Sequence, residues 1–164
     1  MKKPTPDFRA ILRILREHRV DFIIVGGVCA VLQGAPINTF DLDIVHSRKP
    51  TNLDRLIKAL EALNARYRTS GHEKLKPRAS HLASSGHQLL MTLSGPLDLL
   101  GTIGHGHSYE DLAGEAKELD IGEGLRAQVL DLTALVRIKA ETAQEKDKAQ
   151  LAVLRRTLEE KSRS

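Results

Sequence analysis

Asp41 and Asp43 are separated by a single leucine at the start of an apolar stretch. In a β-strand, residues i and i+2 point to the same face, so the two carboxylates would converge while Leu42 and Ile44 face the core. Neighbouring carboxylates repel each other and favour the neutral form unless a cation lies between them, and Mg²⁺ is the commonest such cation with oxygen ligands. Acids also occur on solvent-facing strand edges, where both are simply hydrated. The pair therefore predicts either a divalent-metal site or an exposed edge.

Gly26 and Gly27 lie between an apolar run that is typical of a buried strand and a short apolar run that is typical of a helix. Glycines at such a junction leave backbone amides exposed beside the positive end of the helix, an arrangement that suits a phosphate group. Many glycine pairs form only a tight turn, and for this pair taken alone that alternative stays open.

Asp98 stands alone as an acid in the apolar stretch from Leu97 to Leu100. Aspartate is disfavoured in strands, and burying its charge without a partner is destabilising. Asp98 therefore lies either in water at a strand end or beside a charged group that compensates it.

The elements that must position these residues follow from hydrophobic periodicity. Thr5-Pro6 opens an amphipathic helix, Thr51 caps a second one that runs to residue 63, and Asp131 caps a final helical region to about Lys161 that is interrupted near 142–145. Shorter helices are expected at 28–33 and 109–116, and a loop at 70–86. The expected strands are residues 21–25, 38–45, 67–69, 88–93, 97–103, 118–121 and 126–130, the last two forming a hairpin. This order predicts a mixed α/β or α+β fold, a small mixed sheet flanked by helices with a helical segment at the C-terminus.

The composition fits one domain over residues 1–164, with a core of aliphatic residues because aromatics make up only 3% of the chain. Scarce aromatics also make stacking on bases or sugars an improbable main mode of recognition. A formal charge of +4 permits a polyanionic partner. The single cysteine, Cys29, excludes an intrachain disulfide and is expected to be a buried core residue. With no long apolar run and no signal-peptide pattern, the expectation is a cytoplasmic protein without membrane spans.

The segment from Val25 to Val45 resembles the signature of the nucleotidyltransferase superfamily that includes DNA polymerase β: a glycine pair, a short helix, and Thr-x-Asp-x-Asp on the next strand. The likeness is greatest to the small bacterial branch written Gly-Gly-x-Ala-x-x-x-x-Gly, which includes toxin–antitoxin-linked enzymes. The matching residues are Gly26, Gly27, Ala30, Gly34, Thr39, Asp41 and Asp43. The resemblance covers about residues 8–158.

This resemblance implies roles for residues that spacing alone does not assign. It makes Asp98 the third acid of a metal-binding triad with Asp41 and Asp43, and it places Thr39 with the glycine pair in the nucleotide site. In the C-terminal helical region it implies that Lys139 reaches the triphosphate and that Asp147 orients Lys139 or the loop. The sequence departs from polymerase-like members in having glycine at position 27, where they have a serine that contacts phosphate, and asparagine at position 38, where many relatives have arginine.

The implied activity is transfer of a nucleoside monophosphate from a nucleoside triphosphate to a hydroxyl group, with Mg²⁺ or Mn²⁺ as cofactor. The acceptor is an RNA end, a protein side chain or a small molecule. The alternatives are a catalytically idle partner protein of a toxin–antitoxin-type pair and a nucleotide-binding regulator. The five histidines from the loop at 70–86 onward form no recognisable zinc pattern and receive no assigned role: His72, His81, His87, His105 and His107.

Overall fold

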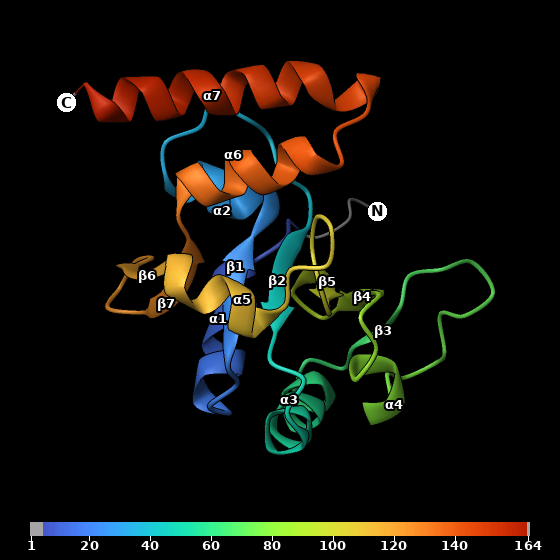
Figure 1. Ribbon diagram of the computed structural model, residues 1–164. Helices are drawn as coiled ribbons and strands as arrows, with labels where there is room; N and C mark the ends of the chain where they lie inside the picture. Colours follow the sequence, from blue (N-terminus) through green and yellow to red (C-terminus); the bar gives the residue numbers. More distant parts are fainter. Residues whose placement is uncertain (1–4, 164) are drawn as a thin grey trace.

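The structure is a computed structural model that describes residues 5–163. A seven-stranded mixed sheet with the order β3-β4-β5-β2-β1-β7-β6 forms its centre (Figure 1). The inner neighbours β2–β5 and β1–β7 are parallel, and the remaining pairs are antiparallel. The strands are β1 Phe22–Val25, β2 Leu42–His46, β3 Arg66–Tyr67, β4 His87–Thr92, β5 Gly95–Leu100, β6 Ala116–Asp120 and β7 Arg126–Leu130.

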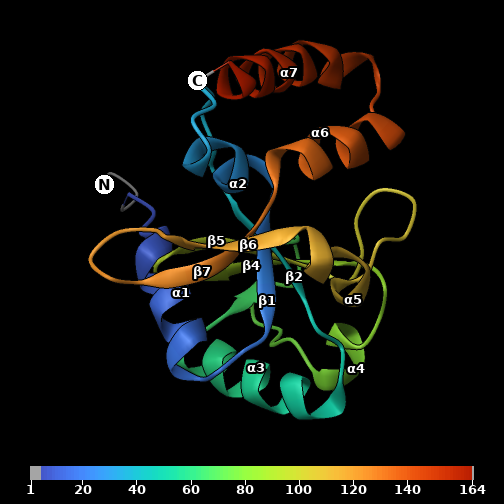
Figure 2. The ribbon, with the colours of Figure 1, turned by 60° about the vertical axis from the view of Figure 1, so that its left-hand side comes forward.

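Helices lie on one side of the sheet and at the end where β1 and β7 finish. α1 and α3 pack together on the side, and α2, α6 and α7 gather at the end (Figures 1 and 2). The helices are α1 Phe8–Glu17, α2 Gly26–Leu32, α3 Pro50–Ala62, α4 Ala79–Leu82, α5 Tyr109–Leu112, α6 Leu132–Glu141 and α7 Lys148–Ser162, with 3₁₀ turns η1 Ala113–Glu115 and η2 Glu145–Asp147. Within residues 5–163, no helix combines the length and the apolarity needed to span a bilayer.

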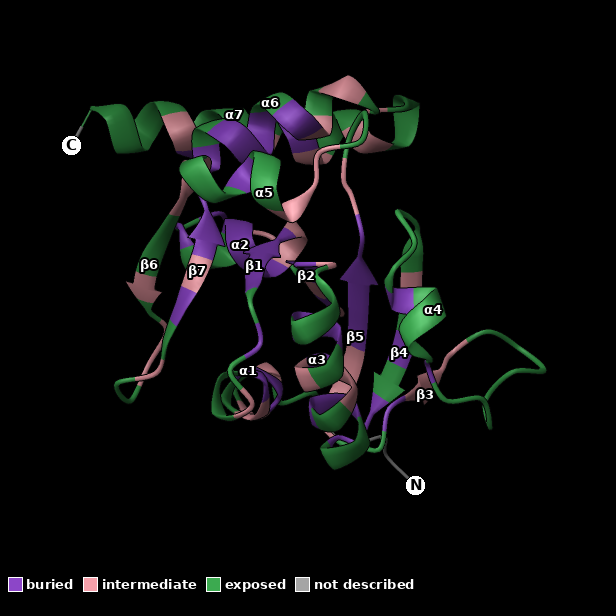
Figure 3. Ribbon diagram, turned by 60° about the horizontal axis from the view of Figure 1, so that its bottom comes forward, coloured by how far each residue is buried: buried purple, intermediate pink, exposed green. Residues whose placement is uncertain are grey.

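The core is aliphatic, as the composition predicts. All four residues of β1 are buried, and so are the apolar stripes of α1 and α3 that pack against the sheet (Figure 3). Burial of these side chains is the main stabilising contribution to the fold. It also fixes which face of β2 and β5 is left to carry the acids, since successive side chains alternate between faces.

A buried glutamine connects α2 to α6. The Gln33 side chain donates a hydrogen bond from Nε2 to the Leu130 carbonyl at 2.8 Å and accepts one at Oε1 from the Leu132 amide at 3.0 Å. The second bond satisfies one of the free amides at the start of α6. Asp131 does stand at the N-cap position, as predicted, but its side chain makes no capping bond and instead pairs with Lys117 at 3.4 Å. Gln33 thus helps to hold α6, which carries Lys139.

Two predicted helix starts, those of α1 and α3, lie at different residues in the structure. Asp7, not Thr5, caps α1, because its carboxylate accepts the Ala10 amide at 3.1 Å. α3 begins at Pro50 rather than after Thr51, since proline at the first helical position loses no hydrogen bond there. Within the predicted loop at 70–86, the structure has one helical turn, α4.

Two predicted strands are too long. β2 begins at Leu42 rather than at residue 38, because its partner β1 ends opposite Asp43, where the chain turns into α2. β5 ends at Leu100, because Gly101 packs directly against the backbone of Ser84. The hairpin at β6–β7 and the interruption between α6 and α7 are confirmed.

Candidate active site

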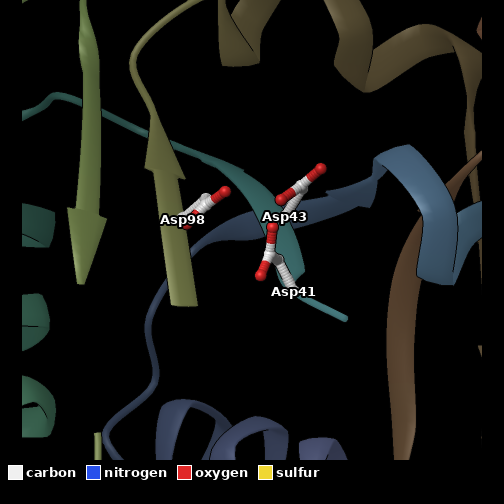
Figure 4. Close-up of side chains that lie close together, drawn as sticks. All are labelled: Asp41, Asp43 and Asp98. Atoms are coloured by element: carbon white, nitrogen blue, oxygen red, sulfur yellow. The ribbon is translucent and has the colours of Figure 1, made fainter. Parts of the chain in front are cut away.

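Three aspartates gather on one face of the sheet where β2 lies beside β5 (Figure 4). The parallel register of the two strands places Asp43 directly opposite Asp98. Asp41 lies in the bend just before β2. One carboxylate oxygen of each residue lies within 4.8 Å of those of the other two. The structure therefore brings the three predicted acids together, although Asp41 itself is not a strand residue.

Asp43 has a strongly raised pKa. Burial raises its pKa from 3.8 to about 7, and the negative charges of Asp98 and Asp41 add to the effect. Its Oδ1 is buried and accepts no hydrogen bond from any described residue. A buried carboxylate oxygen without a donor is destabilising unless a proton or a cation compensates it. Since all donor atoms here are carboxylate oxygens, the site fits a hard divalent cation such as Mg²⁺.

Arg68, which directly follows β3, provides a positive charge at the triad. Its Nη2 lies 2.7 Å from Oδ1 of Asp98, and its Nη1 donates to the Leu90 carbonyl at 2.6 Å. Oδ1 of Asp98 accepts no hydrogen bond of good geometry from the residues that the structure describes, so Arg68 acts on it as a neighbouring charge. This charge also lowers the pKa of Asp43, against the larger effect of burial. Arg68 is not predicted from the sequence, because only the pairing of β3, β4 and β5 brings it to Asp98.

The glycine pair allows close packing beside these acids. Gly26 has φ +66°, and a Cβ on it would overlap the carboxylate of Asp43. A Cβ on Gly27 would lie 2.6 Å from Oγ1 of Thr39. Thr39 in turn donates to the Asp41 carbonyl at 3.1 Å. Glycine is therefore required at both positions by packing alone, because Asp43 and Thr39 lie directly against the start of α2.

A pocket of about 220 Å³ opens beside Asp43 and the glycine pair. Most of its wall is aliphatic and comes from α2, α6, α7 and the end of β5. Lys139 is one of its few polar lining residues, so the structure brings Lys139, Gly26 and Gly27 to the same cavity as Asp43. The lining residues are Val25, Gly26, Gly27, Ala30, Ile37, Asp43, His87, Leu100, Ile103, Gly104, Leu135, Ile138, Lys139, Thr142, Gln150 and Leu154.

Asp147 does not line this pocket in the structure. Its carboxylate accepts the Gln144 amide at 2.9 Å and so closes the turn before α7. A part in nucleotide binding, implied by resemblance alone, stays a prediction for this residue.

The histidines mostly make structural contacts. His107 lies 2.9 Å from Oε1 of Glu141, which also accepts the His105 amide at 3.0 Å, and these contacts hold the loop after β5 against α6. His87 contacts the Thr102 carbonyl at 3.0 Å and lines the pocket. Among residues 5–163, the aspartate triad is the one cluster of acids, histidines and cysteines whose geometry suits a metal ion.

The chain is similar to known proteins in its three-dimensional structure but not detectably in its sequence. The sequence matches no model of a protein family and no curated protein. Three solved structures superpose over most of the chain. A candidate nucleotidyltransferase from Thermotoga maritima has a TM-score of 0.58 at 19% identity, covering 93% of this chain and 91% of its own.

The other two are antibiotic-modifying enzymes. The lincosamide adenylyltransferase LnuA, solved with lincomycin, has a TM-score of 0.59 at 13% identity and covers 90% of this chain and 94% of its own. The resistance factor ANT(2″)-Ia has a TM-score of 0.58 at 16% identity, covering 92% and 82%. Identities this low establish architecture and leave the substrate open. The mixed sheet with its surrounding helices is a nucleotidyltransferase fold.

Proposed function

We propose that the protein is a metal-dependent nucleotidyltransferase that moves a nucleoside monophosphate from a nucleoside triphosphate to a hydroxyl group. The observation that carries this proposal is the convergence of Asp41, Asp43 and Asp98, with a buried oxygen of Asp43 that no described residue satisfies. A structural role does not explain three acids on one face, since hydrophobic residues there would be more stable.

The donor nucleotide fits on the α2 side of Asp43. The triphosphate would lie against the backbone of Gly26 and Gly27, with Lys139 as a positive charge from the opposite wall. The pocket of 220 Å³ is smaller than the roughly 300–1,000 Å³ of sites that enclose drug-sized ligands, so it suits a part of the nucleotide such as the nucleoside. Its aliphatic wall agrees with binding by burial rather than by aromatic stacking.

The chemistry is an in-line displacement. The acceptor oxygen forms a bond to the α-phosphorus. The bond between that phosphorus and the oxygen that bridges it to the β-phosphorus breaks, and pyrophosphate leaves with the electron pair of the broken bond. Asp41 and Asp43 would hold the cation on the triphosphate side, and Asp98 would hold a second one and receive the hydrogen bond of the attacking hydroxyl. Bound Mg²⁺ supplies charge neutralisation and lowers the pKa of the attacking group.

The first experiment compares the wild type with Asp98→Asn and, as a matched control, with Asp54→Asn, which removes an exposed acid of α3. Binding of nucleoside triphosphates with Mg²⁺ is measured by calorimetry. Transfer is followed with nucleotides labelled at the α-phosphate, using cell-extract fractions as acceptors. Asp98→Asn should keep nucleotide affinity within several-fold and lower transfer by at least about 100-fold, roughly 3 kcal/mol of transition-state stabilisation. Asp54→Asn should leave both unchanged.

Two results contradict this function in different ways. If wild type binds nucleotide but transfers nothing to any fraction, the protein is the catalytically idle partner of a toxin–antitoxin-type pair or a regulator. If Asp98→Asn transfers as fast as wild type, Asp98 has no part in the chemistry, and the proposed catalytic role of the three acids is wrong.

A further inference from the structure

Next to the triad, on the side of Asp98 away from the proposed nucleotide pocket, lies the surface of β4. The strand register aligns Asp43 with Asp98 and Asp98 with Leu89 of β4. The amide of Arg68 donates to the Leu89 carbonyl at 3.0 Å, which continues the same row to the edge of the sheet. Paired residues on neighbouring strands point to the same face. From the donor pocket outward, the row therefore reads Asp43, Asp98, Leu89 and Arg68.

This outer side carries an exposed aliphatic stripe. Leu89, Met91 and Leu93 follow one another at strand spacing and are 41%, 44% and 73% exposed. Since residues i and i+2 of a strand share a face, Leu89 and Met91 continue the face that holds Asp98, and Leu93 follows in the turn after β4. Large aliphatic side chains that are exposed together mark a contact surface more often than single ones do. Met91 and Leu93 also line a groove of about 450 Å³ whose other wall includes Arg66, Arg68 and Glu73.

The groove lies beside the most basic part of the chain. Residues 66–78, which form β3 and the loop that extends from the sheet in Figure 1, hold five basic residues and one acidic residue. Their net charge of +4 equals that of the whole protein, so the rest of the chain is balanced. The basic residues are Arg66, Arg68, Lys74, Lys76 and Arg78. Arg66 and Arg68 line the groove, and the other three lie on the loop beside it. The excess positive charge of this segment repels a cationic acceptor and attracts an acidic one.

We propose that this groove is the acceptor site of the nucleotidyltransferase and that the acceptor is a polypeptide surface with acidic and aliphatic side chains around a hydroxyl-bearing residue. The proposal rests on the function proposed above. Three features favour a polypeptide over single-stranded RNA. The stripe is aliphatic, whereas sites for single-stranded nucleic acid stack bases on aromatic side chains. Met and Arg, which lie here together, are enriched at protein interfaces. The groove is open, as a docked surface requires, and its charge selects acidic partners.

The placement also suits the chemistry. A serine, threonine or tyrosine hydroxyl presented over Leu89 arrives next to Asp98, on the side opposite to the pyrophosphate. Its oxygen forms the new ester bond to the α-phosphorus, pyrophosphate departs toward Lys139, and the hydroxyl proton passes to Asp98 and then to water. Arg68, paired with Asp98, forms the wall between the groove and the triad.

The test uses four defined probes with the full-length protein. They are a synthetic peptide of glutamate and leucine residues around one tyrosine, the same peptide with lysine for glutamate, the same peptide with serine for leucine, and a short oligoribonucleotide with a free 3′ hydroxyl. Binding is measured by fluorescence anisotropy, and transfer by label from the α-phosphate of the nucleotide. The glutamate–leucine peptide should bind most tightly and be labelled.

Two variants place a charge in the stripe, Met91→Glu and Leu93→Asp, and Val31→Glu changes an α2 residue of similar exposure, 41%, as the control. Each stripe variant should weaken binding of the glutamate–leucine peptide at least tenfold while nucleotide affinity and the circular dichroism spectrum stay the same. Val31→Glu should bind peptide as wild type does.

The outcomes separate this proposal from the proposed function. Equal peptide binding by wild type and both stripe variants, tighter binding of the oligoribonucleotide, or no binding of any peptide overturns the acceptor groove and leaves nucleotide transfer standing. If the peptide binds through the stripe but no nucleotide binds with Mg²⁺, the groove remains a protein-docking surface and the nucleotidyltransferase proposal fails.

Discussion

Replacing Asp43 by asparagine should make the metal-free protein more stable at neutral and alkaline pH while abolishing its response to Mg²⁺. The physical reason is the environment of the Asp43 carboxylate: its Oδ1 is buried and receives no hydrogen bond from residues 5–163, and two further acids lie beside it. Asparagine keeps the shape and removes the charge. Sites built for function commonly lower stability in this way.

The sign follows from the raised pKa of Asp43, about 7 in the folded protein against the ordinary 3.8. Between these two values the folded state holds a proton that the unfolded state has released, so stability falls as the pH rises from about 4 to about 7 and is then constant. The loss is at most on the order of 4 kcal/mol for a shift of this size. The Asp43→Asn variant lacks this slope, so its advantage over wild type should be near zero at about pH 4 and greatest at about pH 8.

The assay is urea unfolding in the presence of a chelator, from about pH 5 to about pH 8, repeated with excess Mg²⁺. His46 titrates with the opposite sign, because burial lowers its pKa, but it is present in both proteins and cancels in the difference. If Mg²⁺ binds at the triad as proposed, it would displace the proton from Asp43, so stabilisation by Mg²⁺ should grow as the pH rises toward 8. Parallel stability curves for wild type and Asp43→Asn, or equal Mg²⁺ effects in both, would refute the electrostatic argument.

Three further predictions concern other parts of the site and core. Gly27→Ala should destabilise the protein by about 1–3 kcal/mol in urea unfolding and weaken nucleotide binding, because its methyl group meets Thr39; unchanged stability would show that α2 yields freely. Lys139→Met should lower triphosphate affinity about tenfold in calorimetry without changing the Mg²⁺ effect, whereas Lys146→Met should change neither; equal affinities would place the phosphates elsewhere. Cys29, whose pKa burial raises to about 12, should resist alkylation in the folded protein and react only on unfolding, as mass spectrometry can show; rapid labelling of folded protein would contradict its burial.

Local patterns in the sequence predicted most of the elements. The stripe of α1, the β6–β7 hairpin and the break before α7 depend on residues close together in the chain, and each is confirmed. The errors lie at element ends, where distant contacts decide. β2 starts late because β1 ends at Val25, and no pattern within residues 38–41 contains that information.

The triad shows the same division. Asp41 and Asp43 are visible as a local pair, but their proximity to Asp98 depends on the pairing of β2 with β5, which are separated in sequence by α3, β3, α4 and β4. Resemblance, not spacing, suggested Asp98. Arg68 could not be predicted for the same reason, since its contact with Asp98 depends on the pairing of β3 with β4 and of β4 with β5. When a site is formed by several strands of a mixed sheet, the sequence therefore predicts only those of its residues that lie close together in the chain.

The charges at the site give a reason why the proposed enzyme would use a cation in addition to Arg68. Three ionised acids and one arginine leave two negative charges, which a single divalent ion would neutralise. The arrangement is asymmetric, because Arg68 pairs with Asp98 at the groove, whereas no residue in the described part of the chain pairs with Oδ1 of Asp43. A first cation is therefore attracted toward Asp41 and Asp43, on the side where the triphosphate would bind. The charge of Asp98 is compensated by Arg68, whereas no described residue forms an ion pair with Asp43. The line from Asp43 to Asp98 runs from the nucleotide pocket toward the β4 groove, and the nucleoside monophosphate would move in the same direction.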